Sequence, residues 1–328
     1  MNPIQLPLVQ TKHGQALVLD NSFIEKMSCW REFEYAALRR RTPSSPKPAL
    51  HFGGAVHEAL KLRYTASQSE AVLPEVQEQQ LAALAKAFEQ NEPPAGDHRT
   101  FDLATRVITR YNEKYQKEPF RLLTLPSGKP FVEASFLRYL GKVLSSGSLF
   151  KSVTMPVYYS GRIDLGVRDN EGHWVIDHKT AFMFGDSFRE DMETSPQMYG
   201  YCWELQQQGL KPTGFIINAL RIRRPTKAAL LDPEQLVTLE DFQRIPVHVR
   251  QDQIDEWKEN TLDLIEEMLH VMAGSTFPQK KKNHCVGKYG RCQFFDVCNL
   301  PKENRESYLD SALFQDNNWS ALNLEEKV

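Results

Sequence analysis

The chain has 328 residues, with 41% hydrophobic and 25% charged residues and a formal net charge of -2. This composition excludes a disordered chain, a collagen and a small disulfide-rich protein, and no uncharged apolar run is long enough to span a bilayer. The first residues lack the apolar stretch of a signal peptide, so we expect a cytoplasmic protein without a membrane partner. The 5 cysteines are an odd number and cannot all pair as disulfides.

Hydrophobic periodicity predicts helices and strands in a mixed order. In chain order these are helices at 52–65, 76–90 and 101–115, strands at 131–140, 155–167 and 174–180, a helix at 196–208, a strand at 214–222 and a helix at 253–272. This order predicts an α/β core sheet with helical additions.

The segment 160–181, SGRIDLGVRDNEGHWVIDHKTA, predicts a hairpin with acidic residues in both strands. If Asn170 and Glu171 form a two-residue loop, Asp164 lies opposite Asp177, with Cβ atoms about 5 Å apart. Facing carboxylates repel each other, so this register favours a cation between them. Lys179 lies on the same face as Asp177 because the strand period is two. A hard divalent ion takes oxygen ligands of this kind.

A different turn would change this interpretation. A bulge at Gly172 shifts the register by one residue and moves Asp164 to the other face of the hairpin. The acids are then surface charges on an exposed hairpin, and from the residues alone both alternatives stay open.

Basic residues gather in three acid-free stretches, at 35–57, 205–231 and 279–292. Such stretches can build a basic groove for a phosphate backbone, although each alone can also be a solvated face. The candidate DNA-binding residues are Arg39, Arg40, Arg41, Arg221, Arg223, Arg224, Lys280, Lys281 and Lys282.

Four motifs together resemble a known nuclease family. GRID (161–164) followed by DHK (177–179) resembles the core of the PD-(D/E)XK nucleases, with Asp as the second acid. GGAVHEAL (53–60) and QMYGY (197–201) resemble the histidine and Q-x-x-x-Y motifs of the RecB-like branch. The resemblance implies a restriction-endonuclease-like core, a central mixed sheet flanked by helices. We expect one nuclease domain over 1–328, with a helical insertion at 66–118.

The resemblance also implies an activity. It indicates a phosphodiester hydrolase, more typical of an exonuclease than of an endonuclease, that acts on single-stranded DNA or DNA ends in recombination, repair or replication. A helicase or recombination protein is the expected partner. The alternatives are a non-catalytic DNA-binding or assembly subunit that retains the fold, and a zinc-stabilised nucleic-acid-binding module.

The resemblance assigns site residues by position. The implied Mg2+ or Mn2+ ligands are His57, Asp164, Asp177 and the backbone carbonyl of His178. The implied catalytic residues are Asp164, Asp177, Lys179, Gln197 and Tyr201, with Lys179 activating the attacking water. Gln197 and Tyr201 are one helical turn apart and share a face. Glu133 corresponds less closely to an extra acid of some members.

The cysteines suggest a second cofactor. Cys29 precedes the nuclease motifs, and Cys285, Cys292 and Cys298 follow them with the spacing C-x6-C-x5-C. This resembles the iron-sulfur arrangement of AddB-type and CRISPR-associated members, whose first downstream pair is C-x2-C. It implies a 4Fe-4S cluster, with residues 279–300 closing on Cys29. A structural Zn2+ site and free buried thiols are the alternatives. We expect Cys202 to be a core thiol.

Overall fold

The computed structural model describes residues 8–11, 14–45, 47–66, 74–147, 150–226, 235–273, 282–287 and 290–317. The chain divides into two compact units, each built from separate stretches of sequence. The hairpin unit comprises Pro46–Ala134 and Arg162–Ile254. The cysteine unit comprises Met1–Ser45, Ser135–Gly161 and Asp255–Val328. The expected single domain over 1–328 stays a prediction.

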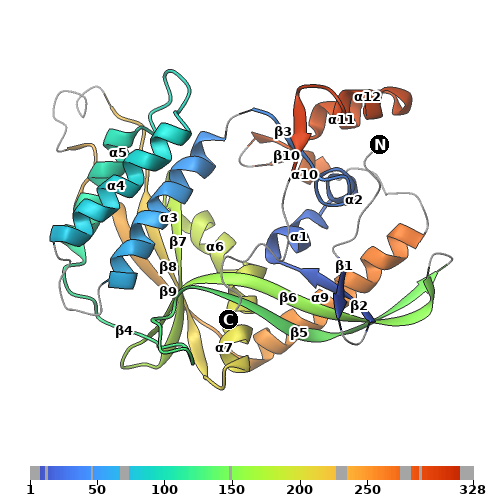
Figure 1. Cartoon of the computed structure of the whole chain (residues 1–328), viewed down its shortest axis with the longest axis horizontal. Coiled ribbons are helices and arrows are strands. Elements are labelled where there is room, and N and C mark those ends of the chain that lie inside the picture. Colours follow the sequence, from blue (N-terminus) through green and yellow to red (C-terminus); the bar gives the residue numbers. More distant parts are fainter. Residues whose placement is uncertain are drawn as a thin grey trace. The chain divides into compact units, whose positions relative to one another are not determined.

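The hairpin unit contains a mixed sheet and most of the long helices (Figure 1). Its elements are α3 (Pro48–Ala66), α4 (Pro74–Gln90), α5 (Phe101–Lys114), β4 (Arg121–Leu122), the end of β6 (Phe150–Arg168), β7 (His173–Ala181), α6 (Asp186–Glu193), α7 (Pro196–Gln207), β8 (Pro212–Arg221), η3 (Leu239–Asp241) and β9 (Phe242–His248). Strands β6 and β7 are antiparallel, β7 and β8 are parallel, and β8 and β9 are antiparallel. The fold is therefore the expected α/β core, a central mixed sheet flanked by helices.

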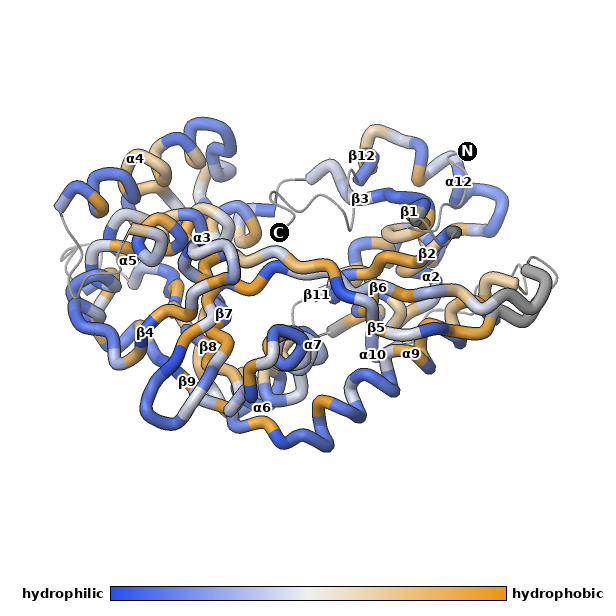
Figure 2. Tube along the Cα trace, turned by 60° about the horizontal axis from the view of Figure 1, so that its bottom comes forward, coloured by the Kyte–Doolittle hydropathy of each residue, from blue (hydrophilic) through white to orange (hydrophobic). Residues whose placement is uncertain are grey.

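Helices cover both faces of this sheet. Ile216 and Leu220 of β8 share a buried core with residues of α3, α4 and α5. Phe215 points to the opposite face and contacts Tyr199 of α7, with ring centroids 6.2 Å apart. Figure 2 shows hydrophobic residues along β7 and β8. Burial on both faces explains why β8 is a nearly continuous apolar run rather than an alternating one.

The hairpin of β6 and β7 has the register of a two-residue loop. Val167 pairs with Trp174 and Leu165 with Ile176, so Asp164 lies opposite Asp177 when this register continues. Asp169 stabilises the turn through its Oδ1. This oxygen accepts hydrogen bonds from the backbone N–H groups of Glu171 and Gly172, and from Trp174 Nε1 at 2.9 Å. The predicted two-residue loop is confirmed and the shifted register is excluded, and the two acids come directly after the last pair of this register.

The cysteine unit joins segments from both ends of the described chain. Its elements are β1 (Leu8–Thr11), β2 (Gly14–Leu19), α1 (Asn21–Lys26), α2 (Trp30–Phe33), η1 (Glu34–Leu38), β3 (Arg41–Pro43), most of β5 (Val132–Gly147), the start of β6, most of α9 (Gln251–Ala273), α10 (Lys282–Cys285), β10 (Val286–Gly287), β11 (Gly290–Arg291), α11 (Phe295–Asn299), η4 (Lys302–Asn304), α12 (Arg305–Leu309) and β12 (Phe314–Asp316). Strand β3 pairs with β12, and β2 runs parallel to β6.

A small core lies between these segments. It contains Tyr35, Ala36, Phe294, Val297 and Leu309, and the partly buried Cys292 and Cys298 pack against it. The segment that carries the last cysteines is therefore ordered by packing against η1. In the ranges that the structure describes, no helix has the length and hydrophobicity to cross a membrane.

Gly214 in β8 is required by the close approach of β9. A Cβ on Gly214 would lie 2.0 Å from the backbone oxygen of Val247, whereas a Cβ on Gly54 of α3 meets nothing within 4 Å. We expect Gly214→Ala to lower the free energy of unfolding by about 3 kcal/mol, since backbone cannot move aside cheaply. Gly54→Ala is the control and should raise it by about 0.5–1 kcal/mol. Urea unfolding measures both, and a Gly214→Ala protein of wild-type stability would contradict the register of β8 and β9.

Candidate functional site

Carboxylates and imidazoles meet where β6 and β7 contact α3. His57 of α3 lies with Nδ1 3.4 Å from Asp164 Oδ2, and its Nε2 is 2.7 Å from the carbonyl oxygen of His178. Asp164 Oδ2 also accepts a hydrogen bond from the His178 backbone N–H at 2.7 Å. The histidine motif and the two strand motifs are therefore in direct contact, although they are far apart in the sequence.

Glu133 adds a second carboxylate to this group. Its ligand atom and those of His57 and Asp164 all lie within 4.8 Å of one another. Its side chain is 9% exposed and pairs with Arg162 Nε at 2.7 Å. The backbone of Glu133 has φ +48°, a left-handed conformation that is rare for residues other than glycine. Strain of this kind concentrates at functional sites, because packing must hold it in place.

Negative charge is crowded in this buried place. The pKa of Asp164 is raised to about 7, mainly by burial and also by the charges of Asp177 and Glu133, while His57 opposes the shift. Burial also raises the pKa of Glu133, against the opposing charge of Arg162. Asp177 Oδ2 is buried and accepts no hydrogen bond within the described ranges, although Lys179 Nζ lies 2.8 Å away.

These observations fit a divalent cation. A buried oxygen without a hydrogen bond and carboxyl groups that resist ionisation are both stabilised by a positive charge between them. The available donors are carboxylate oxygens, one imidazole and one backbone carbonyl, a set that suits Mg2+ or Mn2+.

A chain of polar side chains from α7 holds Lys179. Its Nζ donates to Gln197 Oε1 at 3.2 Å, and Gln197 Nε2 donates to the Tyr201 hydroxyl at 2.8 Å. Pro196 begins α7 directly before Gln197, which places the amide in the first helical turn. The Q-x-x-x-Y residues therefore position the ammonium group beside Asp177.

His178 faces the opposite side of β7 and lies in a polar network that sequence reasoning missed. Its ring is buried and stacks on Tyr64, and its Nδ1 accepts a hydrogen bond from Asn218 Nδ2 at 2.7 Å. Asn218 also donates to the Tyr111 hydroxyl at 2.9 Å. Burial lowers the pKa of His178 well below its usual value, so the ring is neutral. Asn218 is the one polar residue inside the apolar run FIINAL, which is the signal that could have revealed it.

Glu118 completes this network behind the site. It accepts hydrogen bonds from Tyr64, Arg63 and Arg244, and Arg244 binds it with both terminal nitrogens. The exposed fractions of the Arg63 and Arg244 side chains are only 3% and 13%. These arginines therefore order α3 and β9 behind His178 rather than meeting a ligand in solvent.

Most of the expected DNA-binding arginines are engaged in ion pairs. Arg39 pairs with Glu34 and Glu306, Arg41 pairs with Asp310 and Asp316, and Arg221 and Arg223 both pair with Asp241. Arg40 is partly buried and Arg224 is exposed. Lys280 and Lys281 lie outside the described residues, as does the side chain of Lys282. Because Arg221 and Arg223 already pair with Asp241, the stretch 205–231 is better explained as an ordinary protein surface than as part of a DNA-binding groove.

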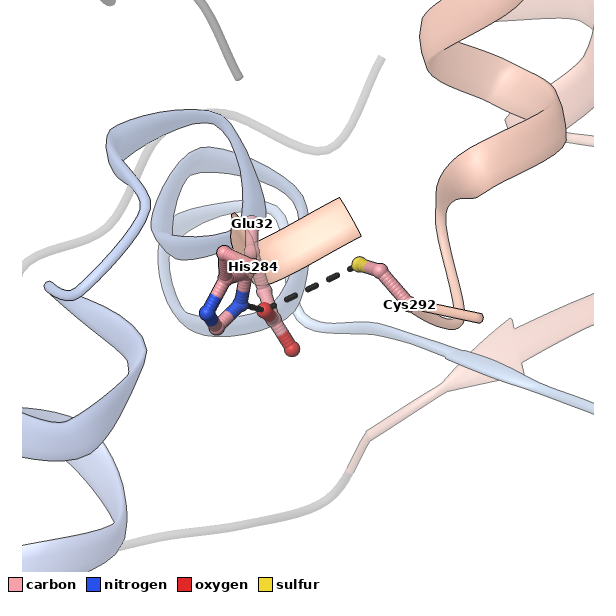
Figure 3. A group of neighbouring side chains, drawn as sticks. All are labelled: Glu32, His284 and Cys292. Atoms are coloured by element: carbon pink, nitrogen blue, oxygen red, sulfur yellow. Dashed lines mark hydrogen bonds and ion pairs between the residues drawn. The ribbon is translucent and has the colours of Figure 1, made fainter. Parts of the chain in front are cut away.

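The cysteine unit holds a second group of possible metal ligands, shown in Figure 3. Glu32, His284 and Cys292 offer ligand atoms that lie within 4.8 Å of one another. Cys292 Sγ is 3.8 Å from Glu32 Oε2, which also contacts His284 Nε2. Burial raises the pKa of the Cys292 thiol to about 12, and the neighbouring Glu32, Cys298 and Cys29 add to the shift.

None of the five cysteines forms a disulfide. Cys29 and Cys285 are buried, and the Cys285 carbonyl oxygen accepts a hydrogen bond from the Cys292 N–H at 2.9 Å. Cys202 is fully buried, as expected for a core thiol. Segments on both sides of the nuclease motifs therefore meet around Cys292.

The raised pKa of Asp164 predicts a pH-dependent stability. Without metal, the Asp164 carboxyl group stays protonated in the folded protein up to about pH 7, whereas in the unfolded chain it loses its proton near pH 4. The contribution of Asp164 to the free energy of unfolding therefore falls as pH rises from about 4 to about 7. We expect Asp164→Asn to melt at a higher temperature than the wild type at pH 7.5 in EDTA, and at a similar temperature at pH 4.5. Thermal denaturation at both pH values measures this, and an equal difference at both would contradict the prediction.

Two solved structures are similar to this chain at low sequence identity. An inferred exonuclease from Eubacterium rectale has 14% identity over 87% of this chain and 88% of that chain, with a TM-score of 0.47. The protein SSO0001 has 12% identity over 85% of this chain and 95% of that chain, with a TM-score of 0.28. No curated protein sequence matches the chain.

A family model provides the assignment. The model of the PD-(D/E)XK nuclease superfamily matches residues 25–299, which include every motif residue named above, from His57 to Tyr201. The matched region covers most of the chain. The chain therefore belongs to the PD-(D/E)XK nuclease superfamily.

Proposed function

We propose that the protein is a metal-dependent deoxyribonuclease that hydrolyses phosphodiester bonds and acts as an exonuclease on single-stranded DNA or DNA ends. The observation that carries the proposal is the pair of facing buried acids, Asp164 and Asp177, with Lys179 2.8 Å from Asp177. A cation and an ammonium group side by side are what a charged phosphoryl transition state requires. Superfamily membership supports nucleic acid as the substrate.

In this proposal His57, Asp164, Asp177 and the carbonyl of His178 hold Mg2+ or Mn2+. The bound ion would supply a water of lowered pKa and polarise the scissile phosphate. Lys179 would donate a hydrogen bond that positions the attacking water or stabilises a charged phosphate oxygen, and Gln197 and Tyr201 keep its ammonium group in place. Glu133 serves as a further carboxylate for the cation. His57 must be neutral to bind a metal, so activity should fall in acid.

The finer choices rest on the motif resemblance. The RecB-like motifs support end processing in recombination, repair or replication, with a helicase or recombination protein as partner. Exonuclease action and the preference for single strands are therefore proposals that cleavage assays must test separately from nuclease activity itself.

Removing the ammonium group tests the mechanism. Lys179→Ala should lower kcat on end-labelled single-stranded DNA with Mn2+ by at least about 100-fold, because a donor to the transition state is lost. DNA binding should change little, and Asp177→Ala should behave in the same way. Lys86→Ala, on the exposed side of α4, is the matched control.

The outcomes separate the alternatives. A fully active Lys179→Ala protein would contradict the proposed role of Lys179 in catalysis. A wild-type protein that binds DNA but never cleaves it with Mg2+ or Mn2+ would support the non-catalytic DNA-binding subunit instead.

We also propose that the cysteine unit binds a metal group. The resemblance favours a 4Fe-4S cluster on Cys29, Cys285, Cys292 and Cys298, and all four cysteines belong to the cysteine unit. The group of Glu32, His284 and Cys292 favours a single ion such as Zn2+.

Metal analysis of anaerobically purified protein distinguishes these cofactors. A cluster gives about four irons per chain and absorbance near 400 nm. Both signals should be lost in Cys298→Ala and kept in His284→Ala. One zinc per chain, lost in His284→Ala and kept in Cys298→Ala, would overturn the cluster proposal.

A further inference from the structure

Arg162 lies beside the candidate metal ligands and has no role in the proposed mechanism. We propose that Arg162 binds a backbone phosphate of the DNA strand at the active site. The inference rests on the proposed nuclease function and adds a substrate contact to it. The guanidinium group of Arg162 forms an ion pair with Glu133, with Nε 2.7 Å from Glu133 Oε2.

The position of Arg162 on β6 directs it to the site. Arg162 and Asp164 are two residues apart, so their side chains leave the same face of the strand, about 7 Å apart along it. This is the face from which Asp164 meets His57. A phosphate bound at the acids would therefore lie within the reach of an extended arginine side chain.

The geometry of the pair leaves donors for a ligand. The contact with Glu133 uses Nε, and a guanidinium group carries four further N–H donors on its two terminal nitrogens. Glu133 is buried and stands on a constrained backbone, so it fixes the plane of the guanidinium group. Two parallel N–H groups in a fixed plane match the oxygens of a phosphate.

Exposure argues against a purely structural role. The Arg162 side chain is 51% exposed, whereas the exposed fractions of Arg63 and Arg244, which order the polar network of the same unit, are 3% and 13%. A half-exposed guanidinium group remains open to an anion from solvent.

The salt dependence of DNA binding tests the phosphate contact without turnover. Binding of single-stranded DNA is measured in EDTA at several salt concentrations, where each phosphate contact contributes about 0.7 to the slope of log K against log salt. We expect Arg162→Ala to lose about that much slope and Arg162→Lys to keep it. Arg168→Ala, at the exposed end of the same strand, is the control and should keep the wild-type slope.

Cleavage gives a second measurement. With Mn2+, Arg162→Ala should lower kcat/KM by about 100-fold, and Arg162→Lys should recover only part of it because an ammonium lacks the planar fork. Arg162→Gln keeps a donor for Glu133 without the charge, so it tests the contact if Arg162→Ala does not fold. It should lose the same slope as Arg162→Ala.

The two proposals fail in different ways. Arg162 variants with wild-type slope and wild-type kcat/KM would overturn the phosphate contact and leave the nuclease function standing. A wild-type protein that cleaves no DNA with either metal would overturn the nuclease function, while a changed slope in Arg162→Ala and Arg162→Gln would still support the phosphate contact.

Discussion

The repulsion between two buried, facing carboxylates is the constraint on which the site depends. The loop between β6 and β7 sets the register that places Asp164 opposite Asp177, and Asp169 stabilises that loop through three hydrogen bonds. A register shifted by one residue would separate the acids and relieve the repulsion. The fold instead keeps the acids together, with Lys179 beside Asp177 and His57 beside Asp164. This arrangement favours cation binding at the expense of folding stability.

Because side chains alternate between the two faces of β7, three consecutive residues have different roles. Asp177 and Lys179 face α7, where Gln197 orients the ammonium group. Between them, the His178 ring points into the core and is neutral, while its backbone oxygen contacts His57. One strand therefore supplies acid, carbonyl and ammonium to the site and is anchored from its other face by the hydrogen bond from Asn218.

Sequence reasoning predicts the long elements and the motif residues, and it misses what depends on distant partners. The helices α3, α4 and α5 follow from apolar periodicity, and the strands β7 and β8 follow from runs of β-branched and aromatic residues. In contrast, β9 contains Pro246 and has a weak strand pattern. The motif order identifies His57, Asp164, Asp177 and Lys179 before any geometry is known. It cannot show that Asp241 engages Arg221 and Arg223, or that Glu133 adopts φ +48°, because these depend on tertiary packing.

The division of the chain has a consequence for dissecting the protein. The hairpin unit is made of two separate stretches and the cysteine unit of three, and the strands β5 and β6 and the helix α9 each contribute residues to both units. No single cut in the chain can therefore release either unit intact, and shortening the gene from one end removes part of one unit before it reaches the other. If a protease cuts the chain between Ala134 and Arg162, each unit would still contain stretches from both fragments.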